Sequence, residues 1–254
     1  MKFFDSHSHY NDEKFDVDRK EILKDLIENH INGAICAGYN IEASKKAIEL
    51  STENKWMYAT CGISPNDIDE AVENQLEVVE KLAKNTKVVA IGEIGLDYYW
   101  NKENKEKQKE FFIKQIEIAN KLNLPIVIHT REAVMDTLEI LKQNKCNKKG
   151  VFHCCPLNIE LVKEALKLGY YISFSGNITF KNAKSDEIIK IVPLDRILIE
   201  TDCPYLSPEP NRGKRNTSAN LIYIAKKIAQ LKEISVEEVS KITYENCKIL
   251  FNIT

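Results

Sequence analysis

Two histidines near the start of the chain have the type and spacing of a metal chelate. His7 and His9 end the run KFFDSHSH at residues 2–9, which begins with apolar residues and reads as a β-strand. Side chains two apart on an extended chain point to the same face, so both imidazoles lie together, beside Asp5. Two such imidazoles can hold one divalent cation. The alternative is a pair of structural histidines satisfied by hydrogen bonds.

A carboxylate follows the apolar run VVAI at residues 88–91. We predict that Gly92 ends this strand, which places Glu93 where the strand meets its loop. A carboxylate in that position is costly to bury unless a cation or strong hydrogen-bond donors meet it. Glu93 is therefore either a metal ligand or a strand-end residue in an ion pair with a lysine.

Three further apolar runs end in potential ligands, namely His129, His153 and Asp202. Together with the two histidines and the glutamate above, they make six candidates, too many for one tetrahedral zinc ion. We therefore predict two divalent cations (Mg²⁺, Mn²⁺ or Zn²⁺), with Glu93 bridging them through its two oxygens. Two ions about 3.5–4 Å apart can activate a water and stabilise both a phosphoryl oxygen and a leaving oxygen.

Eight apolar runs have the length and composition of buried strands and are able to position these ligands. They cover residues 2–9, 33–38, 57–62, 88–91, 124–130, 150–153, 169–174 and 196–202. Helical stripes of apolar residues follow at residues 13–29, 69–84, 103–122, 159–168, 219–231 and 236–251, with shorter ones around Ala47 and Leu138. This alternation predicts an α/β fold, a (β/α)₈ TIM barrel. The carboxyl ends of its strands meet on one face, where active sites are built.

Composition limits the function classes. With 36 basic and 38 acidic residues, the 254-residue chain has a net charge of −2, so it has no overall basic field for nucleic acid. Its first ten residues carry Asp5 and two histidines where a signal peptide needs apolar residues, and no apolar run has the length of a membrane span. Seven cysteines without a CxxC pair predict reduced thiols and a cytoplasmic protein. No linker divides the chain, so residues 1–254 are predicted to form one domain.

Six segments together resemble the TatD-family metal-dependent deoxyribonucleases, a branch of the amidohydrolase-like barrels. They are DSHSHY at 5–10, GEIGLDYYW at 92–100, PIVIHTRE at 125–132, VFHC at 151–154, ETDCPYLSPEPNRGKRN at 200–216 and TYENCKILF at 243–251. The first segment alone is common to many metal-dependent hydrolases. The second and fifth together are specific, and the resemblance extends over essentially the whole chain.

The resemblance implies a role for each ligand. His7, His9, Glu93 and Asp202 would hold one ion, and Glu93, His129 and His153 the other. Asp202 would also act as the base that takes a proton from the attacking water. The implied substrate is DNA, with nucleotides removed from a 3′ end, and no membrane or stable protein partner is implied. Candidate substrate contacts are Ser64, Arg131, Arg212, Lys214 and Arg215.

Two segments depart from the family pattern. After the third strand the family usually has Gly-Ile-His-Pro, whereas this chain has a serine, Ser64, in the histidine position. After the sixth strand, Cys154-Cys155-Pro156-Leu157 replaces the usual Cys-Phe-Ser/Thr-Gly. Neither change touches a predicted ligand. Two alternatives stay open: a related barrel that hydrolyses a small ester, lactone or phosphotriester, and a non-catalytic binding protein on the same fold.

Overall fold

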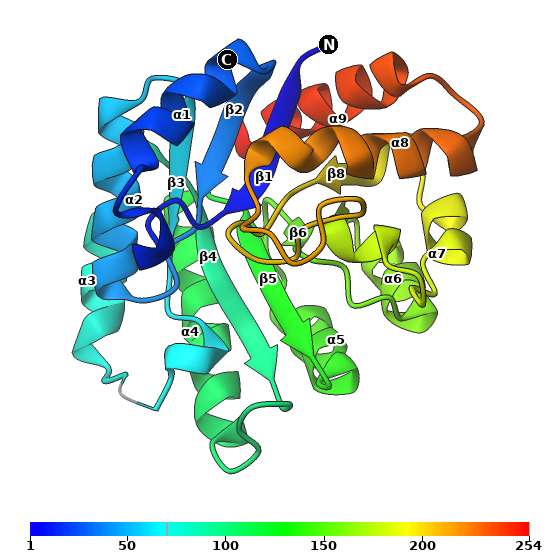
Figure 1. Cartoon of the computed structure of the whole chain (residues 1–254). Helices are drawn as coiled ribbons and strands as arrows, with labels where there is room; N and C mark the ends of the chain where they lie inside the picture. The colour runs from blue at the N-terminus through cyan, green and yellow to red at the C-terminus, as the bar shows by residue number, and fades with distance from the viewer. Residues whose placement is uncertain (70, 254) are drawn as a thin grey trace.

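Eight parallel strands form a single sheet in the order β1 to β8, with the helices around it (Figure 1). The computed structural model describes residues 1–69 and 71–253. The strands are β1 Phe3–Ser8, β2 Ile31–Cys36, β3 Met57–Cys61, β4 Val88–Asp97, β5 Ile126–Arg131, β6 Gly150–Phe152, β7 Tyr171–Phe174 and β8 Ile197–Ile199. The predicted TIM barrel is confirmed.

Hydrogen bonds between β1 and the segment after β8 bring the two ends of the sheet together. The backbone N–H of Asp202 donates to His7 O at 3.0 Å, and that of His9 donates to Cys203 O at 2.8 Å. The buried Asp5 carboxylate accepts from the backbone and hydroxyl of Thr201. Residues almost 200 positions apart in the chain are thereby fixed side by side.

The helices largely follow the predicted alternation. They are α1 Arg19–Glu28, α2 Ile41–Glu53, α3 Asn74–Leu82, α4 Lys105–Leu122, α5 Val134–Gln143, α6 Ile159–Lys167, α7 Asp186–Ile191, α8 Leu221–Lys232 and α9 Val236–Phe251. Side-chain oxygens of Asn40, Asn158 and Ser235 cap α2, α6 and α9 by accepting a backbone N–H three residues on. No described helix is both long and apolar enough to span a membrane.

Two predicted helices begin too early. A 3-10 turn at Glu13–Phe15 precedes α1, so the helix predicted from residue 13 starts at Arg19. The helix predicted from residue 69 starts at Asn74, and Glu70 lies outside the described residues, as does Thr254. The short helix α7 was not predicted, because its six residues are too few to show a helical stripe.

The predicted end of the fourth strand at Gly92 is wrong. β4 continues to Asp97, so Glu93 lies inside the strand. Backbone pairing with β5, from Ile94 opposite Ile128 to Asp97 opposite Arg131, extends the strand past the glycine. Such pairing depends on the neighbouring strand, and local composition does not reveal it.

The apolar core has two parts. The larger part lies between the strands and the surrounding helices. The smaller one includes Phe4, Val127 and Leu198 from the strands together with Leu250 and Phe251 at the end of α9. Ile249, next to them, is exposed and lines the same cavity as Val88 at the start of β4. The end of α9 therefore lies at the amino-terminal end of the strands, and the polar residues that follow the strands gather at the other end.

Candidate metal centre

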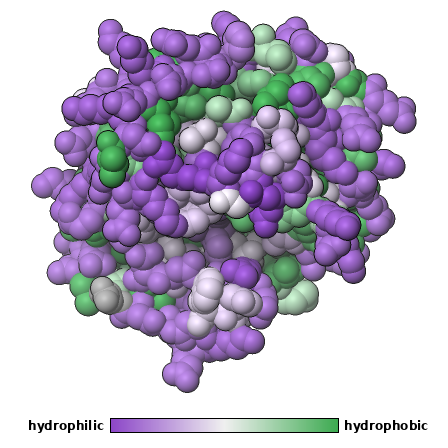
Figure 2. All heavy atoms as spheres, in the orientation of Figure 1, coloured by the Kyte–Doolittle hydropathy of each residue, from purple (hydrophilic) through white to green (hydrophobic). Residues whose placement is uncertain are grey.

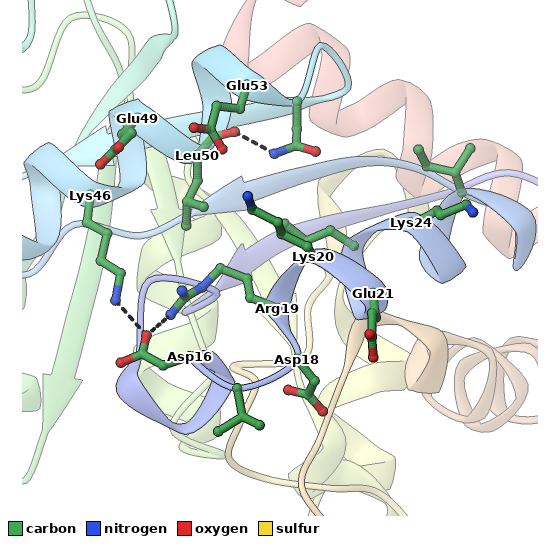
Figure 3. Close-up of a pocket in the computed structure, with 14 residues that line it drawn as sticks. Asp16, Asp18, Arg19, Lys20, Glu21, Lys24, Lys46, Glu49, Leu50 and Glu53 are labelled. Carbon is green, nitrogen blue, oxygen red and sulfur yellow. Dashed lines mark hydrogen bonds and ion pairs between the residues drawn. The ribbon is translucent and has the colours of Figure 1, made fainter.

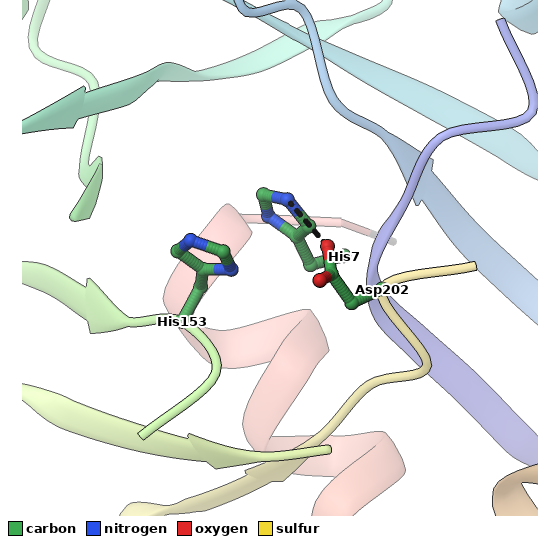
Figure 4. Close-up of side chains that lie close together, drawn as sticks. All are labelled: His7, His153 and Asp202. Atoms are coloured by element: carbon green, nitrogen blue, oxygen red, sulfur yellow. Dashed lines mark ion pairs between the residues drawn. The ribbon is translucent and has the colours of Figure 1, made fainter. Parts of the chain in front are cut away.

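All six predicted ligands meet at the carboxyl-terminal end of the barrel. Three of them, His7, Glu93 and His129, lie on β1, β4 and β5, and the other three, His9, His153 and Asp202, follow β1, β6 and β8. Figure 4 shows His7, His153 and Asp202 facing one another. Three overlapping groups of these side chains have their ligand atoms within 4.8 Å of one another. The prediction that these residues converge is confirmed, although their role as ligands stays a prediction.

Glu93 divides its two oxygens between two pairs of histidines. Its Oε2 lies 3.3 Å from His7 Nε2 and 3.9 Å from His9 Nε2. Its Oε1 lies 3.1 Å from His129 Nδ1 and 3.5 Å from His153 Nε2. Each oxygen of one carboxylate thus faces two imidazole nitrogens, which is the arrangement that bridging between two cations requires.

The imidazole nitrogens are close together within each pair. His7 Nε2 and His9 Nε2 are 3.1 Å apart, as are His129 Nδ1 and His153 Nε2. The two-residue spacing of His7 and His9 correctly predicted that their side chains lie on one face of the chain. Neutral imidazoles whose nitrogen lone pairs are directed at a common point can bind a metal ion there.

Asp202 faces the β1 pair. Its Oδ1 lies 3.1 Å from His9 Nε2 and 3.7 Å from His7 Nε2. The residue follows β8 with a positive φ of 55° and is held there by its backbone hydrogen bond to His7. Burial raises the pKa of this carboxyl, but the bond and charge of His9 outweigh burial and hold the pKa below its usual value. Asp202 is therefore ionised at neutral pH.

The same balance holds Glu93 ionised. Burial raises the pKa of its carboxyl, but the charge of His153 and hydrogen bonds from the surrounding histidines hold it well below its usual range. Burial lowers the pKa of His153, yet the charges of Glu93 and Glu200 raise it well above its ordinary value. In the metal-free protein, the charge that the carboxylates need therefore comes from protons on His9, His129 and His153, whose pKa values are raised, and not from His7, whose pKa burial lowers.

The donor set fits divalent cations. Among the described residues, Glu93 and Asp202 have ion-pair contacts with histidines and none with lysine or arginine. Buried carboxylates without a permanent cation are costly unless a metal or bound protons compensate them. Mixed imidazole and carboxylate oxygen ligands suit Zn²⁺ or Mn²⁺, and carboxylates suit Mg²⁺.

Two carboxylates behind the centre were not predicted to have a role. Asp97 is buried, and its Oδ2 accepts from His129 Nε2 at 2.9 Å. Glu200 Oε1 lies 3.4 Å from His153 Nδ1. Carboxylates in such positions orient histidine ligands and fix their tautomer. Glu93, Gly95 and Asp97 alternate along one face of β4. A strand predicted to continue past Gly92 would therefore have indicated Asp97 as a further residue of the site.

Two predicted substrate contacts occupy different environments. Ser64 is buried, and its hydroxyl accepts from the backbone N–H of Asn66 at 3.1 Å, which caps a 3-10 turn. Arg131 is exposed at the end of β5, with its guanidinium carbon 3.6 Å from the centre of the Tyr99 ring. Arg131 does not pair with the adjacent Glu132, which is instead 3.6 Å from Lys102.

The basic loop after β8 presents its cations unequally. Arg215 donates to both Asp18 oxygens, at 2.9 and 2.5 Å, and to Lys14 O at 2.6 Å. Arg212 lies over the Phe180 ring at 3.7 Å, and Lys214 is exposed. A phosphate would therefore have to compete with Asp18 for Arg215, whereas no carboxylate partner is described for the other two.

A groove elsewhere in the barrel has no such chemistry. It has a volume of about 920 Å³ and lies between α1 and α2, where Asp16 pairs with Arg19 and with Lys46 at 3.0 Å (Figure 3). Its lining includes no histidine. Lysine and arginine neutralise acids in this groove, whereas only histidines do so at the candidate metal centre.

Comparison with known proteins identifies the family of this chain. A family model described as TatD related DNase matches residues 4–252. YabD of Bacillus subtilis (strain 168), named an uncharacterized metal-dependent hydrolase, is 42% identical over 98% of this chain and 99% of its own length. YcfH of Escherichia coli (strain K12), described in the same words, is 37% identical over 100% of this chain and 97% of its own.

Solved structures agree as well. YJJV, a TatD homolog from Escherichia coli K12, matches with a TM-score of 0.94 and 25% identity over 99% of this chain and 98% of its own. A TatD family hydrolase from Entamoeba histolytica matches with a TM-score of 0.88 and 26% identity over 100% and 99%. The resemblance read from the six sequence segments is confirmed, and the chain belongs to the TatD family of metal-dependent hydrolases.

Proposed function

We propose that this hydrolase is a deoxyribonuclease that cleaves phosphodiester bonds in DNA with a water activated by two divalent cations. The observation that carries the proposal is the division of the Glu93 carboxylate, whose Oε2 faces His7 and whose Oε1 faces His129. One ion would be held by His7, His9, Glu93 and Asp202, and the other by Glu93, His129 and His153. Such ions supply Lewis-acid activation of water and neutralise charge that develops on the phosphoryl group.

The chain itself would contribute positioning and proton transfer. Glu93 and the histidines, which lie on the strands or directly after them, would hold the two cations in fixed positions. Asp202 would accept the proton of the attacking water on Oδ2, because Oδ1 already faces His9 and His7. A carboxylate ionised at neutral pH and placed at the mouth of the barrel suits this role.

DNA is the proposed substrate because the matching family model describes nucleases. Arg212 and Lys214, exposed after β8, would meet backbone phosphates in the absence of an overall basic field. We also propose removal of nucleotides from a 3′ end and a cytoplasmic location. The seven cysteines are all free, as suits a reducing compartment.

Metal analysis followed by a nuclease assay tests this function. The purified chain is expected to bind about two divalent cations, as the six ligands imply. With Mg²⁺ or Mn²⁺ it should shorten 5′-labelled single-stranded DNA stepwise, and EDTA should stop the reaction. A lactone and a phosphotriester serve as the comparison substrates. Hydrolysis of either one without any cleavage of DNA would assign the chain to the alternative hydrolase class.

Loss of the Asp97 carboxylate is expected to weaken metal binding. Asp97 accepts hydrogen bonds on both oxygens, from Tyr99 N and Trp100 N on Oδ1 and from His129 Nε2 on Oδ2. Asparagine has one acceptor oxygen, so Asp97→Asn loses one set of bonds whichever way the amide points. We expect Mn²⁺ affinity, measured by calorimetry, to fall about 10- to 100-fold. Asp186→Asn on α7, an exposed partner of Lys227, is the control, and equal affinities in both variants would contradict the role of Asp97.

A further inference from the structure

Two neighbouring aromatic side chains are exposed at the same end of the barrel as the metal centre. Tyr99 is 48% exposed and Trp100 69% exposed, on the loop after β4. Their rings meet edge to face at 4.9 Å, and the guanidinium of Arg131 lies 3.6 Å from the Tyr99 ring and 5.5 Å from the Trp100 ring. Figure 2 shows one face of the molecule, which is mostly hydrophilic and has a central hollow with paler groups of atoms beside it. We call Tyr99, Trp100 and Arg131 together the aromatic platform.

The aromatic platform is rigidly connected to the candidate metal centre through Asp97. Its Oδ1 accepts from the backbone N–H groups of Tyr99 and Trp100, at 2.9 and 3.3 Å. The other oxygen of the same carboxylate accepts from His129. Gln108 on α4 in turn exchanges two hydrogen bonds with the Asp97 backbone, at 2.8 and 3.0 Å. The loop that carries the exposed rings is thus pinned to a residue that also orients a metal ligand.

The strand register sets the spacing between the aromatic platform and the metal centre. On β5, Arg131 is two residues beyond His129, and Asp97 lies opposite Arg131 on β4. Two residues of a parallel strand advance about 7 Å. A stacked nucleic-acid strand advances about 3.4 Å per nucleotide, so this separation corresponds to about two nucleotides.

We infer that the Trp100 ring, which Tyr99 meets edge to face and Arg131 flanks, stacks on an unpaired base about two nucleotides from the bond that is cleaved. This inference rests on the proposed function and deepens it. Aromatic rings and a guanidinium offer flat faces that accept any base, and each stacked base typically contributes roughly 5- to 150-fold in affinity. A base inside a duplex has both faces covered by its neighbours. The aromatic platform therefore selects a nucleotide that has left the stack, without selecting its sequence.

The exposure of Trp100 makes the inference testable without unfolding the protein. A side chain that is 69% exposed contributes little to the core, so Trp100→Ala is expected to fold. Ile249 is also 69% exposed but lies near the end of α9, at the opposite end of the barrel. Ile249→Ala is therefore a control that removes a large apolar side chain of equal exposure far from the metal centre. Trp100→Phe keeps an aromatic face at the tested position.

The test combines cleavage and binding of short single strands that carry one abasic residue at successive positions. In the wild-type protein, one abasic position should lower kcat/KM roughly 5- to 150-fold, mainly through KM. Trp100→Ala should lower kcat/KM on the intact strand by a similar factor and should lose the response to that abasic position. The same variant should lose less kcat/KM on methyl p-nitrophenyl phosphate, a diester without a nucleobase, than on the intact strand. Trp100→Phe should recover most of the wild-type value, and Ile249→Ala should match the wild type.

Binding of the same labelled strands in EDTA, followed by fluorescence anisotropy, separates the two hypotheses. If the protein cleaves DNA but is indifferent to abasic positions and to Trp100→Ala, the aromatic platform is refuted and the nuclease stands. If it fails to cleave DNA yet binds strands in a Trp100-dependent way, the nuclease is refuted, and of the inference only the stacking of a base on the aromatic platform stands. If it neither cleaves DNA nor binds strands through Trp100, both hypotheses are refuted.

Discussion

Replacing Glu93 with alanine is expected to abolish hydrolysis while leaving a folded barrel. Glu93 is the one candidate ligand whose oxygens face both histidine pairs, at 3.3 Å from His7 and 3.1 Å from His129. Its loss removes the proposed bridge, and the two cations would then repel each other without a shared anion. Removing one group that stabilises charge at a reacting centre typically costs about 10²–10³-fold in kcat, and we expect Glu93→Ala to reach or exceed the upper end.

The measurement combines kcat, metal content and circular dichroism. Bound metal should fall from about two ions per chain to one or fewer, as expected when a bridging ligand is lost. Glu117→Ala, which removes an exposed carboxylate from α4, should keep wild-type kcat and metal content. Near wild-type phosphodiesterase activity of Glu93→Ala with added Mn²⁺ would show that the two-cation arrangement is wrong.

Asp202→Asn is expected to lower kcat about 10²–10⁴-fold, the usual contribution of a general base. The amide keeps one oxygen that can face His9 and the metal, but it cannot accept a proton from water. The defect should therefore persist when Mn²⁺ is saturating. A defect that came only from a weakened metal ligand would disappear under that condition.

A second aspartate provides the matched control. Asp195 precedes β8, is 71% exposed and pairs with Arg196 on the surface. Asp195→Asn removes one negative charge from the same part of the chain and should not change kcat. If Asp202→Asn regained full activity at saturating Mn²⁺, Asp202 would be a ligand alone, and another group would take the proton.

The histidines differ in what lies behind them. His129 donates a hydrogen bond to Asp97, and Nδ1 of His153 lies 3.4 Å from the Glu200 carboxylate. No carboxylate is described behind Nδ1 of His7 or of His9, and both atoms are buried without a hydrogen-bond partner among the described residues. An imidazole backed by a carboxylate is the more basic ligand. The aromatic platform depends on the same Asp97 carboxylate. One buried residue thus connects metal binding to the proposed recognition of the substrate.

The barrel and the convergence of the ligands follow from the sequence alone. Eight apolar runs that alternate with helical stripes allow few arrangements, because parallel strands need crossover helices. Once that fold is assumed, side chains that follow the strands must meet on one face. The spacing of His7 and His9 depends only on the two-residue repeat of an extended chain. The alternation of strands and helices repeats along the chain, and the spacing of His7 and His9 is local. Both kinds of feature can be recognised in a sequence.

Long-range pairing decided the rest. The strand boundary at Gly92 was misplaced because β5, not the local composition, extends β4 to Asp97. Arg215 looked available for phosphate until the fold placed Asp18, 197 residues away, against it. The exposure of Trp100 likewise depends on a loop held by Asp97 and Gln108. Each of these features arises from contacts between segments distant in sequence, and only the tertiary structure brings such segments together.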